Sequence, residues 1–120
     1  MVILADKRPT IIASKNFMRR WRALGLTDDD MMFLENSLYE DPTQGDPIVG
    51  GNGLRKMRIA FPNRGKSGSG RICYLDLFIE GKIYLYRIYA KNEQENISQK
   101  ELNELSKDIE ELKHTIRKGR

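Results

Sequence analysis

The spacing of apolar residues changes twice along this 120-residue chain, and that change most constrains its fold. Residues 14–40 and 98–118 carry apolar side chains three or four positions apart, the spacing of one helix face. Residues 54–61 alternate instead, and residues 71–79 and 82–90 are rich in β-branched and aromatic residues, as strands are. The order of these segments predicts an α+β fold. Two helices precede an antiparallel sheet of three to four strands, and a last helix follows it.

Local signals mark the ends of the predicted helices. Ser14 and Thr27 are N-cap residues for the first two helices, and the second helix must end before Pro42. Ser98 and Glu101 form a capping-box pattern, which predicts the start of the last helix. The predicted apolar stripes of the three helices are Phe17, Trp21 and Leu24; Met31, Phe33, Leu34 and Leu38; and Leu102, Leu105, Ile109, Leu112 and Ile116.

Strict alternation assigns the strand side chains to faces. In the first long strand it predicts one buried face and one basic face, made respectively of Met57, Ile59 and Phe61 and of Lys56 and Arg58. In the last strand it predicts two opposite sets, Tyr84, Tyr86 and Ile88 against Leu85, Arg87 and Tyr89. A hairpin through Glu80 and Gly81 is expected to join the last two strands, and residues 9–13 suit a short edge strand.

Positive charge is concentrated in the predicted sheet. Residues 50–91 hold nine basic and two acidic residues, a net charge of +7, whereas the whole chain carries +4. The basic residues are Arg55, Lys56, Arg58, Arg64, Lys66, Arg71, Lys82, Arg87 and Lys91. A basic surface built from one contiguous segment predicts a polyanionic ligand such as nucleic acid; the alternative is a solvated charged surface.

The residue inventory excludes several classes of protein. Cys73 is the only cysteine and His114 the only histidine, which excludes an internal disulfide, a thiolate metal cage and two-histidine enzymes. We expect neither a cofactor nor a metal. The Gly65-Lys66-Ser67 run lacks the upstream glycine of a phosphate-binding P-loop. No apolar run approaches the roughly 20 residues of a membrane span, and the first residues lack the pattern of a secretory signal. We therefore expect a cytoplasmic protein without a membrane partner, in which residues 1–120 form one domain.

Three blocks of the sequence resemble the RelE superfamily of bacterial toxins, and most of all its HigB-like branch. The blocks are Gly53-Leu54-Arg55-Lys56-Met57-Arg58, then Gly65-Lys66-Ser67-Gly68 with Arg71-Ile72-Cys73-Tyr74, and then residues 89–98. The resemblance implies two N-terminal helices on a curved antiparallel sheet. It also implies the toxin of a type II toxin–antitoxin pair, which enters the ribosomal A site and cuts mRNA. The implied partner is a cognate antitoxin, usually with a helix-turn-helix domain, and operator DNA would be reached only through that antitoxin.

The resemblance also implies roles for individual residues. Its catalytic cations fall on Lys56, Arg58, Arg71 and Lys91. Further basic, aromatic and polar residues of the same region are expected to contact RNA, namely Arg55, Arg64, Lys66, Tyr74, Tyr89 and Asn92. Two departures from the family pattern are visible. Asn92 stands where several members have an arginine, and Ser98 stands near the place of a base-stacking tyrosine.

The cations suggest how RNA would be cut. Attack of a 2′-hydroxyl on the adjacent phosphorus builds negative charge on the phosphate oxygens, which cations stabilise. We expect the like charges of Arg58 and Lys91 to crowd Lys56 and to favour its neutral amine, which would take the 2′-proton. Glu93 is an alternative base. Lys66 or Lys91 would assist the leaving oxygen. Three alternatives involve no cleavage: a protein of the same fold that inhibits a target such as gyrase, a plain nucleic-acid-binding module, and a structural partner protein.

Overall fold

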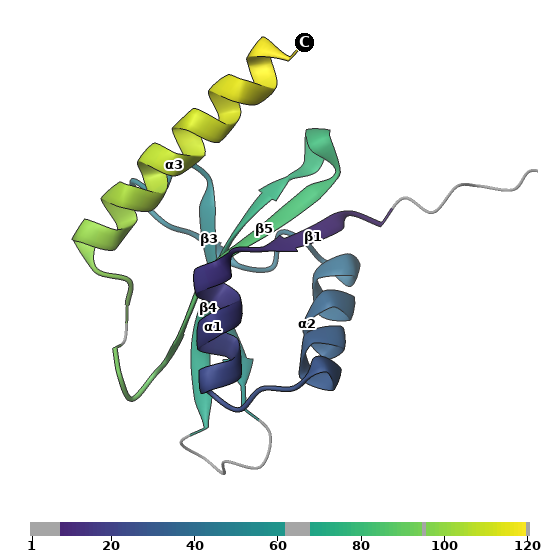
Figure 1. Cartoon of the computed structure of the whole chain (residues 1–120), viewed down its shortest axis with the longest axis vertical. Helices are drawn as coiled ribbons and strands as arrows, with labels where there is room; N and C mark the ends of the chain where they lie inside the picture. Colours follow the sequence, from purple (N-terminus) through teal and green to yellow (C-terminus); the bar gives the residue numbers. More distant parts are fainter. Residues whose placement is uncertain (1–7, 62–67, 95, 120) are drawn as a thin grey trace, which may run out of the picture.

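The structure, a computed structural model, describes residues 8–61, 68–94 and 96–119. Within these residues, one five-stranded sheet with strand order β1-β5-β4-β3-β2 is flanked by three helices (Figure 1). The elements in chain order are β1 Thr10–Ala13, α1 Lys15–Ala23, α2 Asp28–Glu40, β2 Asp46–Pro47, β3 Leu54–Ala60, β4 Ser69–Leu77, a 3₁₀ turn Phe78–Glu80, β5 Lys82–Ala90 and α3 Gln99–Lys118. The predicted α+β class and order of helices are confirmed.

The three long strands form the centre of the sheet. Strands β3, β4 and β5 pair antiparallel in sequence order, as predicted. Two short edge strands enlarge the sheet beyond the expected three or four strands: β2 pairs antiparallel with β3, and β1 pairs parallel with β5. The short strand suggested by residues 9–13 is therefore present, but it makes the sheet mixed rather than purely antiparallel.

The first two helices begin at the predicted caps. The Ser14 hydroxyl accepts a hydrogen bond from the Phe17 backbone N–H at 3.0 Å. At the start of α2, Thr27 and Asp30 form a complete capping box: the Asp30 N–H donates to the Thr27 hydroxyl at 3.2 Å, and the Thr27 N–H donates to the Asp30 carboxylate at 2.8 Å. Each cap satisfies backbone donors that the first helical turn leaves free.

One member of the predicted α2 stripe is misplaced. Leu34 and Leu38 are buried as expected, but Phe33 is 80% exposed. Successive helical residues are about 100° apart, so Phe33 cannot share the line that Leu34 and Leu38 occupy. Its side chain lines a groove of about 480 Å³ between α2 and the outer edge of β3.

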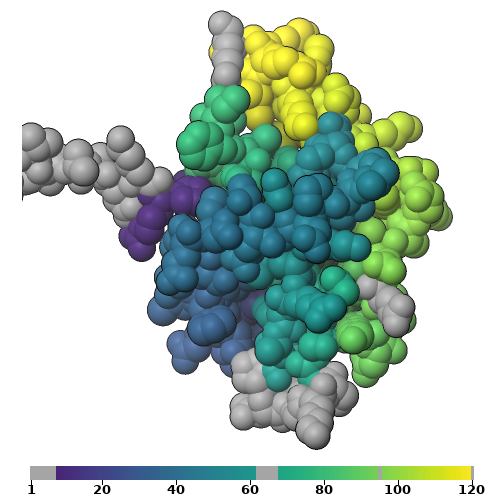
Figure 2. Space-filling model, turned by 180° about the vertical axis from the view of Figure 1, so that it is seen from behind, coloured from purple at the N-terminus to yellow at the C-terminus, as the bar shows by residue number. Residues whose placement is uncertain are grey.

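The two faces of the sheet carry separate apolar clusters. Helices α1 and α2 cover one face, where the first cluster includes Phe17, Trp21, Leu34, Leu38, Met57, Ile72, Tyr74, Ile83, Leu85 and Ile88. Helix α3 covers part of the other face, where the second cluster joins Leu54, Cys73, Leu75 and Tyr89 to Leu102, Leu105 and Ile109. In the view from behind, the blue segment that contains α2 occupies the middle of the molecule, and α3 lies along its rim (Figure 2).

A β-bulge in β5 changes which face its side chains occupy. Cys73 lies opposite Arg87, but the next residue, Tyr74, lies opposite Leu85, which leaves Tyr86 as an extra residue in β5. The alternation restarts after this residue. Consequently Ile88 joins Leu85 in the α1/α2 cluster, whereas Arg87 faces the α3 side. The predicted faces of β5 are therefore wrong beyond Tyr86.

Two glycines allow the strands to meet as they do. A Cβ on Gly70 would collide with the Tyr89 carbonyl oxygen and the Phe61 ring, so the start of β4 requires glycine. Gly81 has a φ of +64° and ends the 3₁₀ turn between β4 and β5. The predicted hairpin is thus present, with a longer connection than expected, because Phe78 and Ile79 lie in this turn and not in a strand.

Candidate nucleic-acid interface

Two neighbouring rows of the sheet bring four basic residues together. Arg58 of β3 lies opposite Arg71 of β4 in the strand register. In the next row on the same face, Cys73 lies between Lys56 of β3 and Arg87 of β5. We call Lys56, Arg58, Arg71 and Arg87 the cationic cluster. Adjacent strands are about 4.8 Å apart and alternate residues about 7 Å apart, so one phosphate group is within reach of several of these side chains.

The cationic cluster lies on the face of the sheet that α3 shares. The residues between its members, Met57 and Ile72, are buried in the opposite cluster under α1 and α2. Side chains alternate between faces, so Lys56, Arg58 and Arg71 point to the other side, together with the buried Cys73 and Tyr89. Arg58 is exposed and Lys56 is half-buried. The sequence-based prediction that Lys56 and Arg58 share the face opposite Met57 is confirmed.

Lys91 lies at the end of the same sheet, away from Lys56. Its backbone N–H donates to the Ser69 carbonyl at 2.9 Å, directly after the pair of Ala90 and Gly70. Four ladder positions separate it from Lys56, a distance on the order of 13 Å along the strands. The expected crowding of Lys56 by Lys91 is therefore absent. Asn92 follows Lys91 in an exposed turn.

Two residues expected to contact RNA have structural partners on the opposite face. The Tyr74 side chain is 0% exposed. Its hydroxyl accepts a hydrogen bond from the Gly45 N–H at 2.9 Å and donates to the Pro42 carbonyl at 2.8 Å. Arg55 donates to the Gly45 carbonyl at 2.7 Å and to the Thr43 carbonyl at 3.2 Å. Because these contacts hold the segment before β3, Tyr74 has no ring surface for a base and Arg55 lies away from the cationic cluster.

The remaining predicted contacts have mixed outcomes. Tyr89 lies next to Arg71 in the register and on the same face, but its side chain is only 6% exposed. Its ring packs in the α3 cluster, so little of it is open for contact with a base. Arg64 and Lys66 lie outside the described residues.

The pKa values of two buried side chains, Cys73 and Tyr89, depend on the charges around them. Burial raises the pKa of the Cys73 thiol to about 12, so the thiol is protonated and unreactive near neutral pH. Four charged side chains act on this thiol: Glu101 raises its pKa further, and three members of the cationic cluster oppose the rise, namely Lys56, Arg87 and Arg71. Burial likewise raises the pKa of Tyr89 to about 12. Cys73 therefore lies at the centre of the charged side chains.

Arg87 was not predicted to belong to the cationic cluster. Its guanidinium Nε lies 3.4 Å from the Glu101 carboxylate of α3, and its Nη1 donates to the Tyr86 carbonyl at 2.9 Å. Uninterrupted alternation places Arg87 beside Leu85, on the core face. Arginine is rarely buried without a partner, so its placement on the same face as a core leucine is unfavourable. This conflict is the sequence signal that pointed to the bulge.

An ion pair holds the turn that carries Lys91 and Asn92. Arg20 of α1 contacts both carboxylate oxygens of Glu93, at 2.7 and 2.9 Å. Glu93, the alternative base of the sequence analysis, is therefore engaged by an arginine. The two N–H groups that follow Asn92, those of Glu93 and Gln94, donate to the Ala90 carbonyl and complete the turn.

The arrangement suits a phosphodiester ligand. Guanidinium groups bind phosphate oxygens through two parallel hydrogen bonds, and neighbouring cations stabilise negative charge that grows on those oxygens. Among the residues that the structure describes, no group of three or more His, Cys, Asp or Glu side chains could hold a metal ion. None of the helices in the described ranges is long and apolar enough to cross a membrane.

Comparison with protein families agrees with this geometry. A family model described as the RelE toxin of the RelE/RelB toxin–antitoxin system matches residues 10–118. The match spans all the strands and helices described above, including the whole of the cationic cluster.

Proposed function

Since the chain belongs to the RelE toxin family of toxin–antitoxin systems, we propose that it is a ribosome-dependent endoribonuclease that cuts mRNA during translation. Family membership means that the chain is a toxin with a cognate antitoxin. The proposal adds the reaction and its residues. The match over residues 10–118 also supports our proposal that residues 1–120 form one toxin domain.

The observation that carries the proposal is the convergence of Lys56, Arg58 and Arg71 on adjacent strands. Family resemblance had suggested these residues separately, from two blocks of sequence. Strand pairing makes Arg58 and Arg71 direct neighbours, with Lys56 two residues away on the same face. Cations that strand pairing holds side by side would need little reorganisation when negative charge develops on a phosphate.

The reaction follows from the chemistry of RNA. The 2′-oxygen attacks the adjacent phosphorus, the bond from phosphorus to the 5′-oxygen breaks, and the products are a 2′,3′-cyclic phosphate and a 5′-hydroxyl. In our proposal Arg58 and Arg71 bind the non-bridging oxygens, with Lys56 beside them. Lys91, at the end of the sheet, neutralises charge on the leaving oxygen.

We propose that the ribosome supplies the geometry of attack. The cationic cluster lies on a strand surface, and His114, the only histidine, is exposed on α3. Aligning the 2′-oxygen with the phosphorus is a large part of the barrier in such reactions, and mRNA held in the A site is already positioned. The purified protein should therefore cut ribosome-bound mRNA much faster than free RNA.

The remaining parts of the proposal follow the HigB-like resemblance. The toxin acts in the cytoplasm, where translating ribosomes are found. Its antitoxin carries a helix-turn-helix domain, through which the pair contacts operator DNA. The basic sheet segment, with a net charge of +7 over residues 50–91, is the surface that meets the ribosome and its mRNA.

The test is to express the chain alone in a bacterium and to map new mRNA 5′ ends. We expect growth arrest together with cuts inside translated reading frames. Arg71→Ala should lower the cleavage rate about 10²- to 10³-fold, the loss seen when one stabilising donor is removed. Arg22→Ala is the matched control, because Arg22 is an exposed arginine on α1 outside the cationic cluster. Growth arrest without new 5′ ends would contradict the proposal and favour a target such as gyrase.

A further inference from the structure

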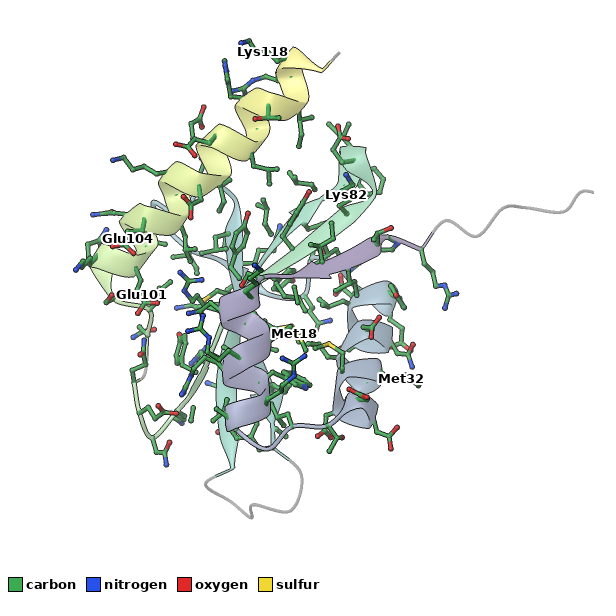
Figure 3. All side chains as sticks on the ribbon, viewed as in Figure 1. Met18, Met32, Lys82, Glu101, Glu104 and Lys118 are labelled. Atoms are coloured by element: carbon green, nitrogen blue, oxygen red, sulfur yellow. The ribbon has the colours of Figure 1, made fainter. Side chains whose placement is uncertain are left out.

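Glu101 is a carboxylate placed among the cations of the site. It lies on the first turn of α3, at the lower end of that helix in Figure 3, with Glu104 one turn further along. Its carboxylate is 3.4 Å from the Arg87 guanidinium, and its side chain is 38% exposed. The Glu101 charge acts on both Cys73 and Tyr89, which are buried in the same face. Glu101 therefore combines access to solvent with a position at the cationic cluster.

The starts of α2 and α3 differ in their caps. In α3 the Glu101 carboxylate does not accept the hydrogen bond from the N-cap N–H that completes a capping box. Thr27–Asp30 and Ser98–Glu101 have the same spacing, and in α2 the acidic side chain folds back onto the N-cap N–H at 2.8 Å. In α3 the Ser98 hydroxyl accepts from the Glu101 N–H at 3.1 Å. Among the hydrogen bonds of the described residues, the reciprocal one from the Ser98 N–H to the Glu101 carboxylate is missing. The predicted capping box is thus half-formed, and the carboxylate is directed to β5.

The strength of the ion pair with Arg87 does not explain why the Glu101 carboxylate turns away from the N-cap. A partly exposed pair at 3.4 Å contributes little to stability, and half of the cap is given up to form it. Glu101 and three members of the cationic cluster act together on the buried Cys73 thiol: Lys56 on β3, Arg71 on β4 and Arg87 on β5. Of these three, Arg87 contacts the Glu101 carboxylate. A phosphate bound by these cations would bring its neighbouring ribose to the carboxylate.

We propose that Glu101 is the general base of the cleavage step, with Arg87 as the residue that positions it. This inference rests on the proposed function. The Glu101 carboxylate takes the proton of the 2′-hydroxyl as the 2′-oxygen bonds to phosphorus. The bond from phosphorus to the 5′-oxygen then breaks, and the 5′-oxygen takes a proton from solvent water. The carboxylate replaces the neutral Lys56 amine expected from sequence, because it is open to solvent and lies against a member of the cationic cluster.

Two other carboxylates are rivals with weaker positions. Glu93 is bound through both oxygens by Arg20. Asp46 lies opposite Lys56 in the short pairing of β2 with β3, at the outer edge of the sheet. It is separated from Arg87 by the whole width of β3 and β4. Glu93 lines the same cavity as Arg87 and Glu101, but Arg20 binds both of its oxygens, and Asp46 lies outside that cavity.

The experiment measures single-turnover cleavage of ribosome-bound mRNA by the full chain. Glu101→Gln keeps the size of the side chain and one acceptor oxygen for Arg87, but it removes the negative charge and cannot take a proton. It should lower the cleavage rate at least about 100-fold, the range of general-base catalysis. Binding to ribosomes that hold mRNA with a 2′-deoxyribose at the cleavage position should be unchanged. Glu104→Gln, an exposed substitution of the same kind on the same helix, is the matched control and should cut normally.

Three further measurements separate the base from a structural role. Arg87→Gln should cost less activity than Glu101→Gln, because the carboxylate remains; an equal loss would mean that Glu101 only holds Arg87. A cleavage rate that rises steadily with pH between about 6 and 8 would overturn the inference, because a lysine base requires such a rise. A loss confined to Asp46→Asn would assign the base to Asp46.

The outcomes also distinguish the two proposals. If the wild-type chain cuts mRNA and Glu101→Gln cuts equally well, this inference is wrong and the endoribonuclease proposal stands. If the wild-type chain cuts no mRNA on ribosomes, the proposed function itself fails. A Glu101→Gln variant that is more active than wild type would also overturn the inference, because it would make the ion pair inhibitory.

Discussion

The two faces of the sheet are made from the same three strands but differ in what covers them. The face under α1 and α2 is closed by apolar side chains, with Phe17 and Leu38 at 0% exposure. The other face is closed only where α3 lies, around Leu105 and Ile109, and carries the cationic cluster beyond it. Burial of apolar area stabilises the first face, whereas the second combines a smaller core with a cluster of charges.

This difference shows how a small domain can keep a charged surface on a stable sheet. Side chains alternate between faces, so Met57 and Ile72 contribute to the core while their neighbours Lys56 and Arg71 remain available to ligand. Substitutions should therefore separate into two kinds. Those on the α1/α2 face should change the free energy of unfolding, and those in the cationic cluster should change activity.

The largest effect is expected from a charge in the small core under α3. Ile109 is 0% exposed, so Ile109→Asp buries a carboxylate without a partner. That cost is several kcal/mol, comparable with the whole stability of a small domain, and the variant should be unfolded at 37 °C. Circular dichroism during heating provides the measurement. Ile116→Asp, nearer the end of α3 and only half-buried, is the control and should remain folded. A folded Ile109→Asp would mean that α3 is dispensable for the second face.

The next largest effect is expected from a cavity in the core under α1 and α2. Phe17 packs against Trp21 with ring centroids 5.7 Å apart, and Phe17→Ala should lower the free energy of unfolding by about 3–5 kcal/mol. Urea denaturation measures this difference, with Arg22→Ala as an exposed control on the same helix. Cleavage per folded molecule should not change, because Phe17 lies on the face opposite the cations. A loss below about 1 kcal/mol would show that this face tolerates cavities and that the contrast between the faces is weaker.

A smaller effect separates Tyr74 from an RNA-binding role. Tyr74→Phe removes the hydroxyl that serves the Gly45 N–H and the Pro42 carbonyl. Leaving these groups without a partner should lower the free energy of unfolding by about 1–3 kcal/mol. Ribosome-bound mRNA should be cut at the wild-type rate once the fraction of folded protein is matched. Reduced cleavage with an unchanged free energy of unfolding would indicate that Tyr74 contacts RNA after all.

The smallest effect concerns the ion pair between α1 and the turn after β5. Arg20 and Glu93 are partly exposed, with side chains 36% and 46% accessible, so Glu93→Gln should cost at most about 1 kcal/mol. The difference from wild type should shrink when the salt concentration is raised, because salt screens exposed charges. Urea denaturation at low and high salt measures both quantities. A cost that is large and insensitive to salt would make this pair part of the core of the α1/α2 face.

The sequence predicted the parts of this protein that depend on local interactions. Ser14 and Thr27 cap their helices as expected, since a cap is formed by residues three positions apart. Lys56 and Arg58 share a face because one uninterrupted strand carries them. The concentration of basic residues over residues 50–91 is likewise a property of the sequence itself, because it depends only on the order of residues along the chain.

Tertiary structure decided the features that depend on how strands pair. The extra residue at Tyr86 moved Arg87 to the cationic cluster and Ile88 to the core, and a bulge arises from the fit between β4 and β5, which no local pattern encodes. Tyr74 is buried on the α1/α2 face, where its hydroxyl is hydrogen-bonded to a segment distant in sequence. The Ser98–Glu101 spacing predicts a capping box, but α3 packs near β5 and the Glu101 carboxylate pairs with Arg87 instead. Periodicity specifies a face only within one continuous strand or helix, and contacts between elements decide which face meets the ligand.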